Sequence, residues 1–327
     1  MTHATGIGSW PGTSIRDALG QVRELLDGHL PYLPELPARG PGADLVGRTA
    51  ALLVELHVDL QPTGWRLVDR PGRDARRTAA LLREDLDELA EAFDGHRGPL
   101  KVQVAGPWTL AAGVWLPRGE RVVADPGACR DLAASLAEGV RAHVAAVRRL
   151  VPDAEVVLQV DEPSLPAVLD GRLPTASGYG RLPAPDPQDA LSALAAVLGA
   201  AGPADTVLHC CAADPPIALL RDAGPGALSL DTTLLGPRGW EGVAVAVEDG
   251  IRLLAGAVPT DGSVGRAQDV ADQVADAWHR VGMPRATLAD LVVTPACGLA
   301  GCSPDEARRL QRLAVDAAAE LTERGAS

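Results

Sequence analysis

The chain has 327 residues, of which 46% are hydrophobic and 22% are charged, proportions that are typical of a globular protein. Its 43 acidic and 30 basic residues give a formal net charge of −13, which argues against nucleic acid or an anionic membrane as a partner. No apolar run approaches the roughly 18 residues that a membrane span needs. The first ten residues, MTHATGIGSW, lack the basic and apolar regions of a signal peptide. We therefore expect a cytoplasmic protein.

Short runs rich in Val and Leu alternate with longer amphipathic stretches along the whole chain. Most of these runs are continuously apolar, as expected for parallel strands that are buried on both faces. We expect strands over residues 4–10, 55–62, 100–107, 155–163, 205–212, 226–233, 251–259 and 289–297.

Helical periodicity fills the intervals between these strands. Apolar residues recur there at helical spacing, with charged residues on the opposite face. Ser14 and Ser303 stand where N-capping residues are expected. The clearest helices are predicted over residues 14–28, 74–93, 126–150 and 303–323.

Eight strands, each followed by a stretch compatible with a helix, are the count of a TIM barrel, (β/α)₈. We therefore predict an α/β fold in which residues 1–327 form a single barrel domain. A doubly wound sheet is the alternative, but no G-x-G-x-x-G motif follows the first strand. Two segments rich in Pro and Gly, 30–42 and 163–187, exceed a minimal barrel. We expect loops there, either lids over a substrate or surface excursions without function.

Side chains that bind metals stand at the ends of three predicted strands. His209 and Cys211 end the fifth strand, Asp231 ends the sixth and Cys297 ends the eighth. The strand ends of a barrel meet at one rim, and Cys sulfur and His nitrogen suit Zn²⁺. Alternation along a strand places His209 and Cys211 on the same face. We predict that these residues hold zinc, with Asp231 as a fourth or displaceable ligand.

The remaining cysteines leave alternatives open. Five cysteines, an odd number, are poor evidence for disulfides in a cytosolic chain. Cys210 is expected to point away from the metal, and any single cysteine is often a core residue. Cys302, which forms a C-x₄-C pattern with Cys297, is an alternative ligand.

Four motifs in the sequence belong together: GIGSWPGT (6–13), QVDEPSL (159–165), LHCCA (208–212) and TPACGLAG (294–301). With them, essentially the whole chain resembles the catalytic barrel of cobalamin-independent methionine synthase. In that family zinc is held by His, Cys, a carboxylate and Cys, and it binds the thiol of homocysteine, to which a methyl group is transferred. The resemblance therefore implies a zinc-dependent S-methyltransferase that forms methionine.

The resemblance also implies roles for individual residues. The His and Cys residues named above match the zinc positions, and Asp231 stands where the family has Glu. Ile7, Gly8 and Ser9 match the stretch that holds the carboxylate of the amino acid, a role that suits amides at a helix entry. Asp161 matches the carboxylate that contacts the substrate ammonium and is the candidate catalytic residue.

The chain also departs from the family pattern. We expect no room for the N-terminal half with which full-length members help to bind methylfolate. No His is found in LLAGAVPTDG (253–262), where the family has one that protonates the departing pterin, although Asp261 lies there. The family's Gly-Glu segment after strand two is replaced by QPTGWRL (61–67). The donor is therefore left open between methylfolate and a methylcorrinoid. Two alternatives to methyl transfer to homocysteine are left open. One is transfer to a different thiol acceptor, and the other is a non-enzymatic barrel that binds zinc and a corrinoid partner.

Overall fold

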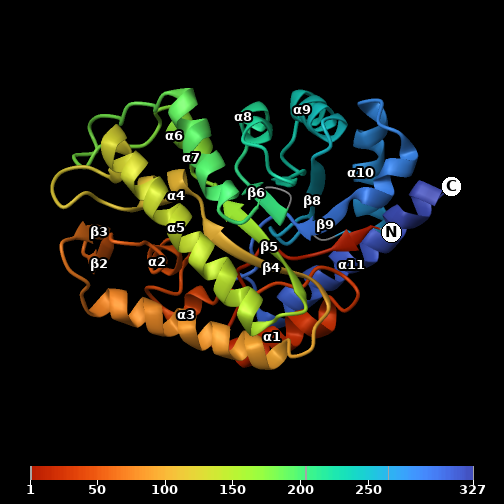
Figure 1. The fold of residues 1–327 in the computed structure, drawn as a ribbon. Helices are drawn as coiled ribbons and strands as arrows, with labels where there is room; N and C mark the ends of the chain where they lie inside the picture. The colour runs from red at the N-terminus through yellow and green to blue at the C-terminus, as the bar shows by residue number, and fades with distance from the viewer. Residues whose placement is uncertain (1, 203–204, 264, 327) are drawn as a thin grey trace.

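The computed structural model describes residues 2–202, 205–263 and 265–326. Seven parallel strands form one curved sheet in the order β1-β9-β8-β7-β6-β5-β4, and helices pack around it (Figure 1). These strands are β1 (His3–Ala4), β4 (Gly98–Ala105), β5 (Ala154–Asp161), β6 (Thr206–Cys210), β7 (Ala227–Asp231), β8 (Arg252–Val258) and β9 (Val292–Pro295).

An irregular segment, residues 30–35, closes the barrel between β1 and β4. The amide of Leu30 donates to the carbonyl of Ala4 at 3.0 Å, and the amide of Leu33 donates to the carbonyl of Lys101 at 2.9 Å. The segment does not form a regular ladder because its two prolines have no N–H to donate. With this segment in the eighth position, the fold is a (β/α)₈ barrel.

The strand expected over residues 55–62 is not part of the barrel. Residues His57–Gln61 (β2) pair antiparallel with Gly64–Val68 (β3) in a separate two-stranded sheet, which Figure 1 shows to one side of the central strands. Apolar and polar residues alternate along β2, which is the pattern of a half-exposed antiparallel strand. The prediction of a barrel strand here was wrong, and so was the prediction that all of 30–42 is a loop.

Helices follow most of the barrel strands, and the four predicted from the sequence correspond to α1, α3, α5 and α11. Ser14 caps α1 by accepting the amide of Asp17 at 3.3 Å, and Ser303 accepts the amide of Glu306 at 3.3 Å at the start of α11. The longer helices are α1 (Ile15–Leu25), α3 (Arg73–Ala92), α5 (Pro126–Leu150), α7 (Pro187–Gly199), α9 (Pro237–Glu248), α10 (Ala267–Arg280) and α11 (Pro304–Ala326). The shorter ones are α2 (Leu45–Ala50), α4 (Pro107–Gly113), α6 (Leu165–Leu169), α8 (Ile217–Asp222), and the 3₁₀ turns η1 (Pro37–Arg39), η2 (Val122–Ala124) and η4 (Arg285–Asp290).

The inside of the barrel has an apolar floor and a polar layer above it. Val157, Val207, Ala227, Leu254 and Val292 form a small apolar cluster in the first halves of their strands, separate from the main core between sheet and helices. Further along the same strands the buried residues are polar, among them Gln159, Asp161, His209, Ser229 and Thr294. The polar layer therefore lies toward the carboxyl ends of the strands, where barrels place their active sites.

The second expected loop, 163–187, is only partly irregular. It contains α6 and ends where α7 begins, and Pro174 and Arg181 form an isolated antiparallel bridge within it.

Among the described residues, no helix is long and apolar enough to cross a membrane.

Candidate active site

Two thiols meet at the carboxyl end of the barrel. Cys211 directly follows β6, Cys297 follows β9, and their sulfur atoms lie 3.9 Å apart. Cys210, between His209 and Cys211, is fully buried in the core between the sheet and the helices. Strand alternation therefore separates the neighbouring cysteines, because Cys210 packs outward while Cys211 reaches the rim.

The thiol pair is arranged so that one sulfur ionises readily. The hydrogen bond between the two thiols lowers the pKa of Cys297, and the hydrogen bond from the amide of Gly298 lowers it further. The same interaction raises the pKa of Cys211. Cys297 is exposed to solvent, so the thiol whose pKa is lowered is one that an outside molecule can reach.

Ser9 lies against the loop that carries Cys297. A Cβ atom at Gly298 would collide with the Ser9 hydroxyl, so this position needs a glycine. The amide of Leu299 donates to the carbonyl of Ser9 at 2.9 Å. The turn after β1 is thereby attached to the rim next to the thiol pair.

His209 is held in one tautomer at the end of β6. Its Nδ1 lies 3.0 Å from the carbonyl oxygen of Ser229 and 3.1 Å from the hydroxyl of the same residue. A carbonyl oxygen only accepts, so Nδ1 carries the proton and Nε2 keeps its lone pair. Burial and the nearby Lys101 lower the pKa of His209 to about 4, so the imidazole is neutral at pH 7.

Asp231 ends β7 on the same rim. Its Oδ1 accepts the amide of Thr233 at 3.0 Å and the hydroxyl of Thr233 at 2.6 Å. Burial raises the pKa of Asp231, and the Thr233 donors oppose that shift. The charge of Asp231 raises the pKa of Cys297.

The predicted zinc ligands thus lie on one rim, but they do not surround a single metal position. Among the described residues, no three His, Cys, Asp or Glu side chains are gathered tightly enough to hold a metal ion. The structure brings the two thiols together and leaves His209 and Asp231 on neighbouring strands. Cys302, the alternative ligand, is half-buried and packs against the main core.

Asp161 is buried at the end of β5 and is tied to its own strand. Its Oδ1 accepts the side-chain amide of Gln159 at 2.7 Å. Burial and the neighbouring Glu35 raise the pKa of Asp161 well above its ordinary value, while Lys101 lowers it. The carboxylate is therefore one whose ionised form a positively charged ligand would stabilise.

Glu35 is a second buried carboxyl group that the sequence analysis missed. It is 3% exposed and lies at the end of the irregular barrel segment, where its amide donates to the carbonyl of Gly8 at 3.0 Å. Burial raises its pKa, and the charge of Arg48, whose Nε is 3.7 Å from Oε1 of Glu35, lowers it. Because the second strand was sought at 55–62, the Glu in LPYLPELP was not recognised as a strand-end carboxylate.

The turn at Ile7, Gly8 and Ser9 is held by all three of its carbonyl groups. The carbonyl of Ile7 accepts a hydrogen bond from the ammonium of Lys101. The carbonyl of Gly8 accepts one from the amide of Glu35, and the carbonyl of Ser9 accepts one from the amide of Leu299. The turn therefore lies between the two buried carboxyl groups and the thiol pair. The predicted carboxylate-binding stretch and the predicted ammonium contact are brought to the same part of the rim.

Asp261 stands after β8, where a proton donor was sought. Its Oδ1 accepts the amide of Ser263 at 2.9 Å and also the hydroxyl of Ser263. These hydrogen bonds lower the pKa of Asp261, so the group is ionised near neutral pH. A carboxylate held in this way is a poor general acid.

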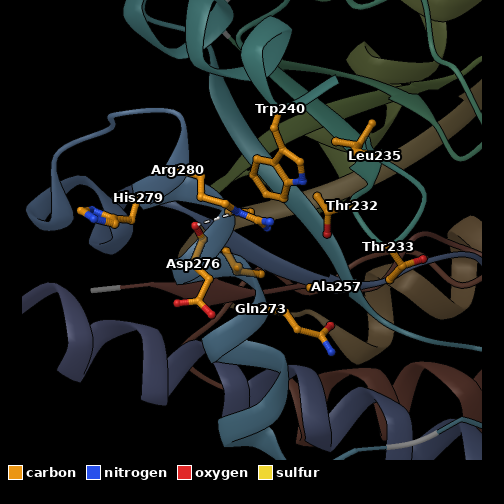
Figure 2. A pocket seen from close by; sticks show the side chains of 11 residues that line it. Thr232, Thr233, Leu235, Trp240, Ala257, Gln273, Asp276, His279 and Arg280 are labelled. Atoms are coloured by element: carbon orange, nitrogen blue, oxygen red, sulfur yellow. Dashed lines mark hydrogen bonds between the residues drawn. The ribbon is translucent and has the colours of Figure 1, made fainter. Parts of the chain in front are cut away.

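A separate cavity of about 450 Å³ opens between α9 and α10 (Figure 2). Trp240, Thr232 and Arg280 face it, and the Arg280 guanidinium donates to the carbonyl of Asp276 at 3.3 Å. None of the predicted zinc or substrate residues lines this cavity. The cavity is lined by α9 and α10 and by residues at the ends of β7 and β8, among them Thr232, Thr233 and Ala257.

The fold and the site define a (β/α)₈ barrel with thiol, imidazole and carboxylate groups at its carboxyl rim. The sequence profile of the family described as "Cobalamin-independent synthase, Catalytic domain" matches residues 1–320. The chain therefore belongs to the family of cobalamin-independent methionine synthase catalytic domains, which is a family of enzymes. The family resemblance inferred from the motifs is confirmed. No curated protein sequence matches the chain.

Solved structures are similar in fold. One is described as a B12-independent methionine synthase from Shewanella sp. W3-18-1 in complex with selenomethionine. It is 13% identical, has a TM-score of 0.63, and the match covers 98% of this chain and 97% of that chain. A mutant of morphinone reductase in complex with tetrahydroNAD has a TM-score of 0.41 at 15% identity, over 95% of this chain and 86% of that chain. The first likeness confirms the predicted barrel fold.

Proposed function

We propose that this protein is a zinc-dependent S-methyltransferase that moves a methyl group to the thiol of homocysteine to form methionine. In that reaction a new S–CH₃ bond replaces the bond between the methyl group and its donor, and the thiol gives up its proton. The observation that carries the proposal is the thiol pair at 3.9 Å, which lies beside the turn at Ile7–Ser9 on the barrel rim. Family membership alone does not supply the substrate.

The spacing of the thiol pair fits a zinc ion, although the described His, Cys, Asp and Glu side chains are not gathered around a metal position. Two sulfurs bound to one tetrahedral zinc at about 2.3 Å each lie about 3.8 Å apart, close to the separation of Cys211 and Cys297. His209 would supply Nε2, because its Nδ1 proton is used by Ser229, and Asp231 would supply a carboxylate oxygen. Bound zinc would keep the substrate thiol deprotonated near neutral pH while leaving it nucleophilic.

The protein's own residues would hold the amino-acid part of the substrate. Asp161 and Glu35 are buried carboxyl groups, and the charge of Glu35 raises the pKa of Asp161. An ammonium between them would stabilise both ionised forms. The amides of the turn at Ile7–Ser9 would hold the carboxylate. The Shewanella protein is described in complex with selenomethionine, an amino acid that carries the same two charged groups.

The choice of methyl donor depends on whether residues 253–262, where the family has a His, can supply a proton. Demethylating a tertiary amine such as methylfolate needs a proton on the leaving group, which is general-acid work worth about 10²–10⁴ in rate. Asp261 is held ionised by Ser263 and does not supply that proton. A methylcorrinoid has a good leaving group without it. We expect methylcobalamin to give faster initial rates than methyltetrahydrofolate at equal concentration with homocysteine. If methyltetrahydrofolate is faster, another group supplies the proton.

The experiment that tests the function combines a metal assay with product detection. Purified protein should contain about one zinc per chain and should form methionine from homocysteine and one of the two donors. Zinc without methionine formation would contradict the substrate assignment. It would favour alkyl transfer to a different thiol or a barrel that only binds zinc and a corrinoid partner, and a screen of other thiols separates those two.

A further inference from the structure

Lys101 is the only lysine in the chain, and its side chain is fully buried inside the barrel. A buried ammonium loses its hydration, so it is retained only where its contacts compensate for that loss. A Met of nearly the same length would fill the same space beside the Tyr32 ring, whose centroid is 5.2 Å from Nζ. Packing alone therefore does not explain a lysine at this position.

The contacts of Lys101 form a bracket with Gln159. The Lys101 Nζ donates to the carbonyl of Ile7 at 2.9 Å and to Oε1 of Gln159 at 2.6 Å. The Gln159 Nε2 in turn donates to the same Ile7 carbonyl at 2.7 Å and to Oδ1 of Asp161 at 2.7 Å. The side-chain hydrogen bonds that leave the Lys101–Gln159 pair end on the carbonyl of Ile7 or on Asp161.

The bracket joins the two halves of the amino-acid site. Ile7 belongs to the turn proposed to bind the carboxylate, and Asp161 is proposed to bind the ammonium. Gly6, the residue before Ile7, lies so close to Tyr32 that a Cβ atom there would be 2.5 Å from the ring. The Tyr32 ring therefore packs against the start of the turn at Gly6, while Lys101 and Gln159 set the position of the turn relative to Asp161.

We propose that Lys101 is a positioning residue, which acts through Gln159 to hold the carboxylate-binding turn and Asp161 at the spacing of an α-amino acid. This inference rests on the proposed function, since it assigns a role in recognition of the same substrate. Without the ammonium, Oε1 of Gln159 loses its donor, its amide is free to turn, and both Ile7 and Asp161 lose a fixed partner. The thiol pair, on the other side of the turn, keeps its contacts.

The test compares Lys101→Met with wild-type protein, using L-methionine as the calorimetric probe on the zinc-loaded full chain. We expect L-methionine to bind about 10- to 100-fold more weakly, the equivalent of losing one or two charge-assisted hydrogen bonds. KM for homocysteine should rise by a similar factor while kcat changes less, and zinc content should stay at the wild-type level. A general structural defect would lower zinc content and kcat together.

Two further variants make the result decisive. Gln159→Leu removes the other half of the bracket and should weaken L-methionine binding to the same extent, even if Lys101→Met does not fold. Gln311→Met is the matched control, because Gln311 is an equally buried amide that donates to the carbonyl of Thr5 at 3.1 Å but has no contact with Asp161. It should bind L-methionine like the wild type.

The outcomes separate this inference from the proposed function. If Lys101→Met and Gln159→Leu fold and bind L-methionine as tightly as wild-type protein, the positioning role is wrong and the function stands. Wild-type protein that binds neither L-methionine nor homocysteine overturns the proposed function itself.

Discussion

At the residue scale, the two adjacent cysteines at the end of β6 have opposite surroundings. Cys210 is fully buried against the helices, whereas Cys211 faces Cys297 on the rim. Cys211→Ser or Cys297→Ser should each reduce zinc from about one per chain to nearly none, because each change removes one of the few thiolates in the proposed set. Elemental analysis of the purified variants measures this loss.

The matched control is Cys210→Ala, which shortens a core side chain and leaves the rim unchanged. It should keep zinc at the wild-type level. Wild-type zinc in both rim variants would contradict the assignment of the thiol pair as ligands.

The buried carboxyl groups allow a second test at this scale. Asp161→Asn removes a negative charge from the proposed ammonium contact but keeps the size of the side chain. We expect L-methionine binding to weaken by about 1.5–3 kcal/mol, as for other charge-assisted contacts, with zinc unchanged. Calorimetry on folded protein checks this value. An unchanged affinity would assign Asp161 to structure alone.

At the scale of elements, Glu162 shows how a strand end supports a neighbouring helix. Its Oε1 accepts the amide of Trp108 at 2.9 Å, and its Oε2 accepts the amide and the hydroxyl of Thr109 at 2.8 and 2.7 Å. It therefore satisfies free amides at the start of α4. Glu162→Gln replaces one acceptor oxygen with a donor. It should lower the free energy of unfolding by about 1–3 kcal/mol in urea titrations.

Zinc content separates this structural role from a catalytic one. Glu162→Gln should keep wild-type zinc, because the hydrogen bonds of the Glu162 carboxylate go to Trp108 and Thr109 at the start of α4. A variant with normal stability and lost activity would place Glu162 in the chemistry instead.

Most of the barrel was predictable from sequence because its buried parallel strands are continuous apolar runs. The exception is the second position. There the segment LPYLPE carries prolines that prevent a regular ladder, while residues 55–62 carry an alternating pattern that reads as a strand. Both form extended backbone, but only their hydrogen-bond partners show which one lies in the barrel. Sequence patterns do not contain those partners.

The site was predictable to the same extent. His209, Cys211, Asp231 and Cys297 were found because each follows a recognisable strand. Glu35 follows the strand that was misplaced, so its position at the rim was hidden. The contacts of Lys101 were also hidden, because they join β1, β4 and β5 across the inside of the barrel. Long-range contacts of this kind depend on closure of the barrel, which no local pattern reports.

At the scale of the whole molecule, the chain carries a formal net charge of −13, and its barrel also buries ionisable groups. Asp85 is fully buried and contacts the guanidinium groups of Arg39 and Arg48, and Arg48 in turn lies next to Glu35. The proposed substrate site is thus connected to an ion-pair network that extends to α3. Removing one partner from such a network leaves an uncompensated buried charge, so the stability of the fold and the geometry of the site are linked.

The pH dependence of stability provides a test of this buried interior. His143, in α5, is 5% exposed, and burial together with the charge of Arg48 lowers its pKa to about 4. The unfolded chain therefore takes up a proton at this residue near pH 6.5, and the folded protein does not until about pH 4. Since the unfolded state binds the extra proton in that interval, stability falls as the pH falls through it.

We therefore expect wild-type protein to lose about 2 kcal/mol more unfolding free energy than His143→Gln between pH 7 and pH 5. Urea titrations of both proteins at the two pH values measure the difference. The other buried histidine, His209, contributes equally to both proteins and cancels. If the two proteins lose stability in parallel, His143 is protonated in the folded state, and α5 does not shield it from water as tightly as the structure shows.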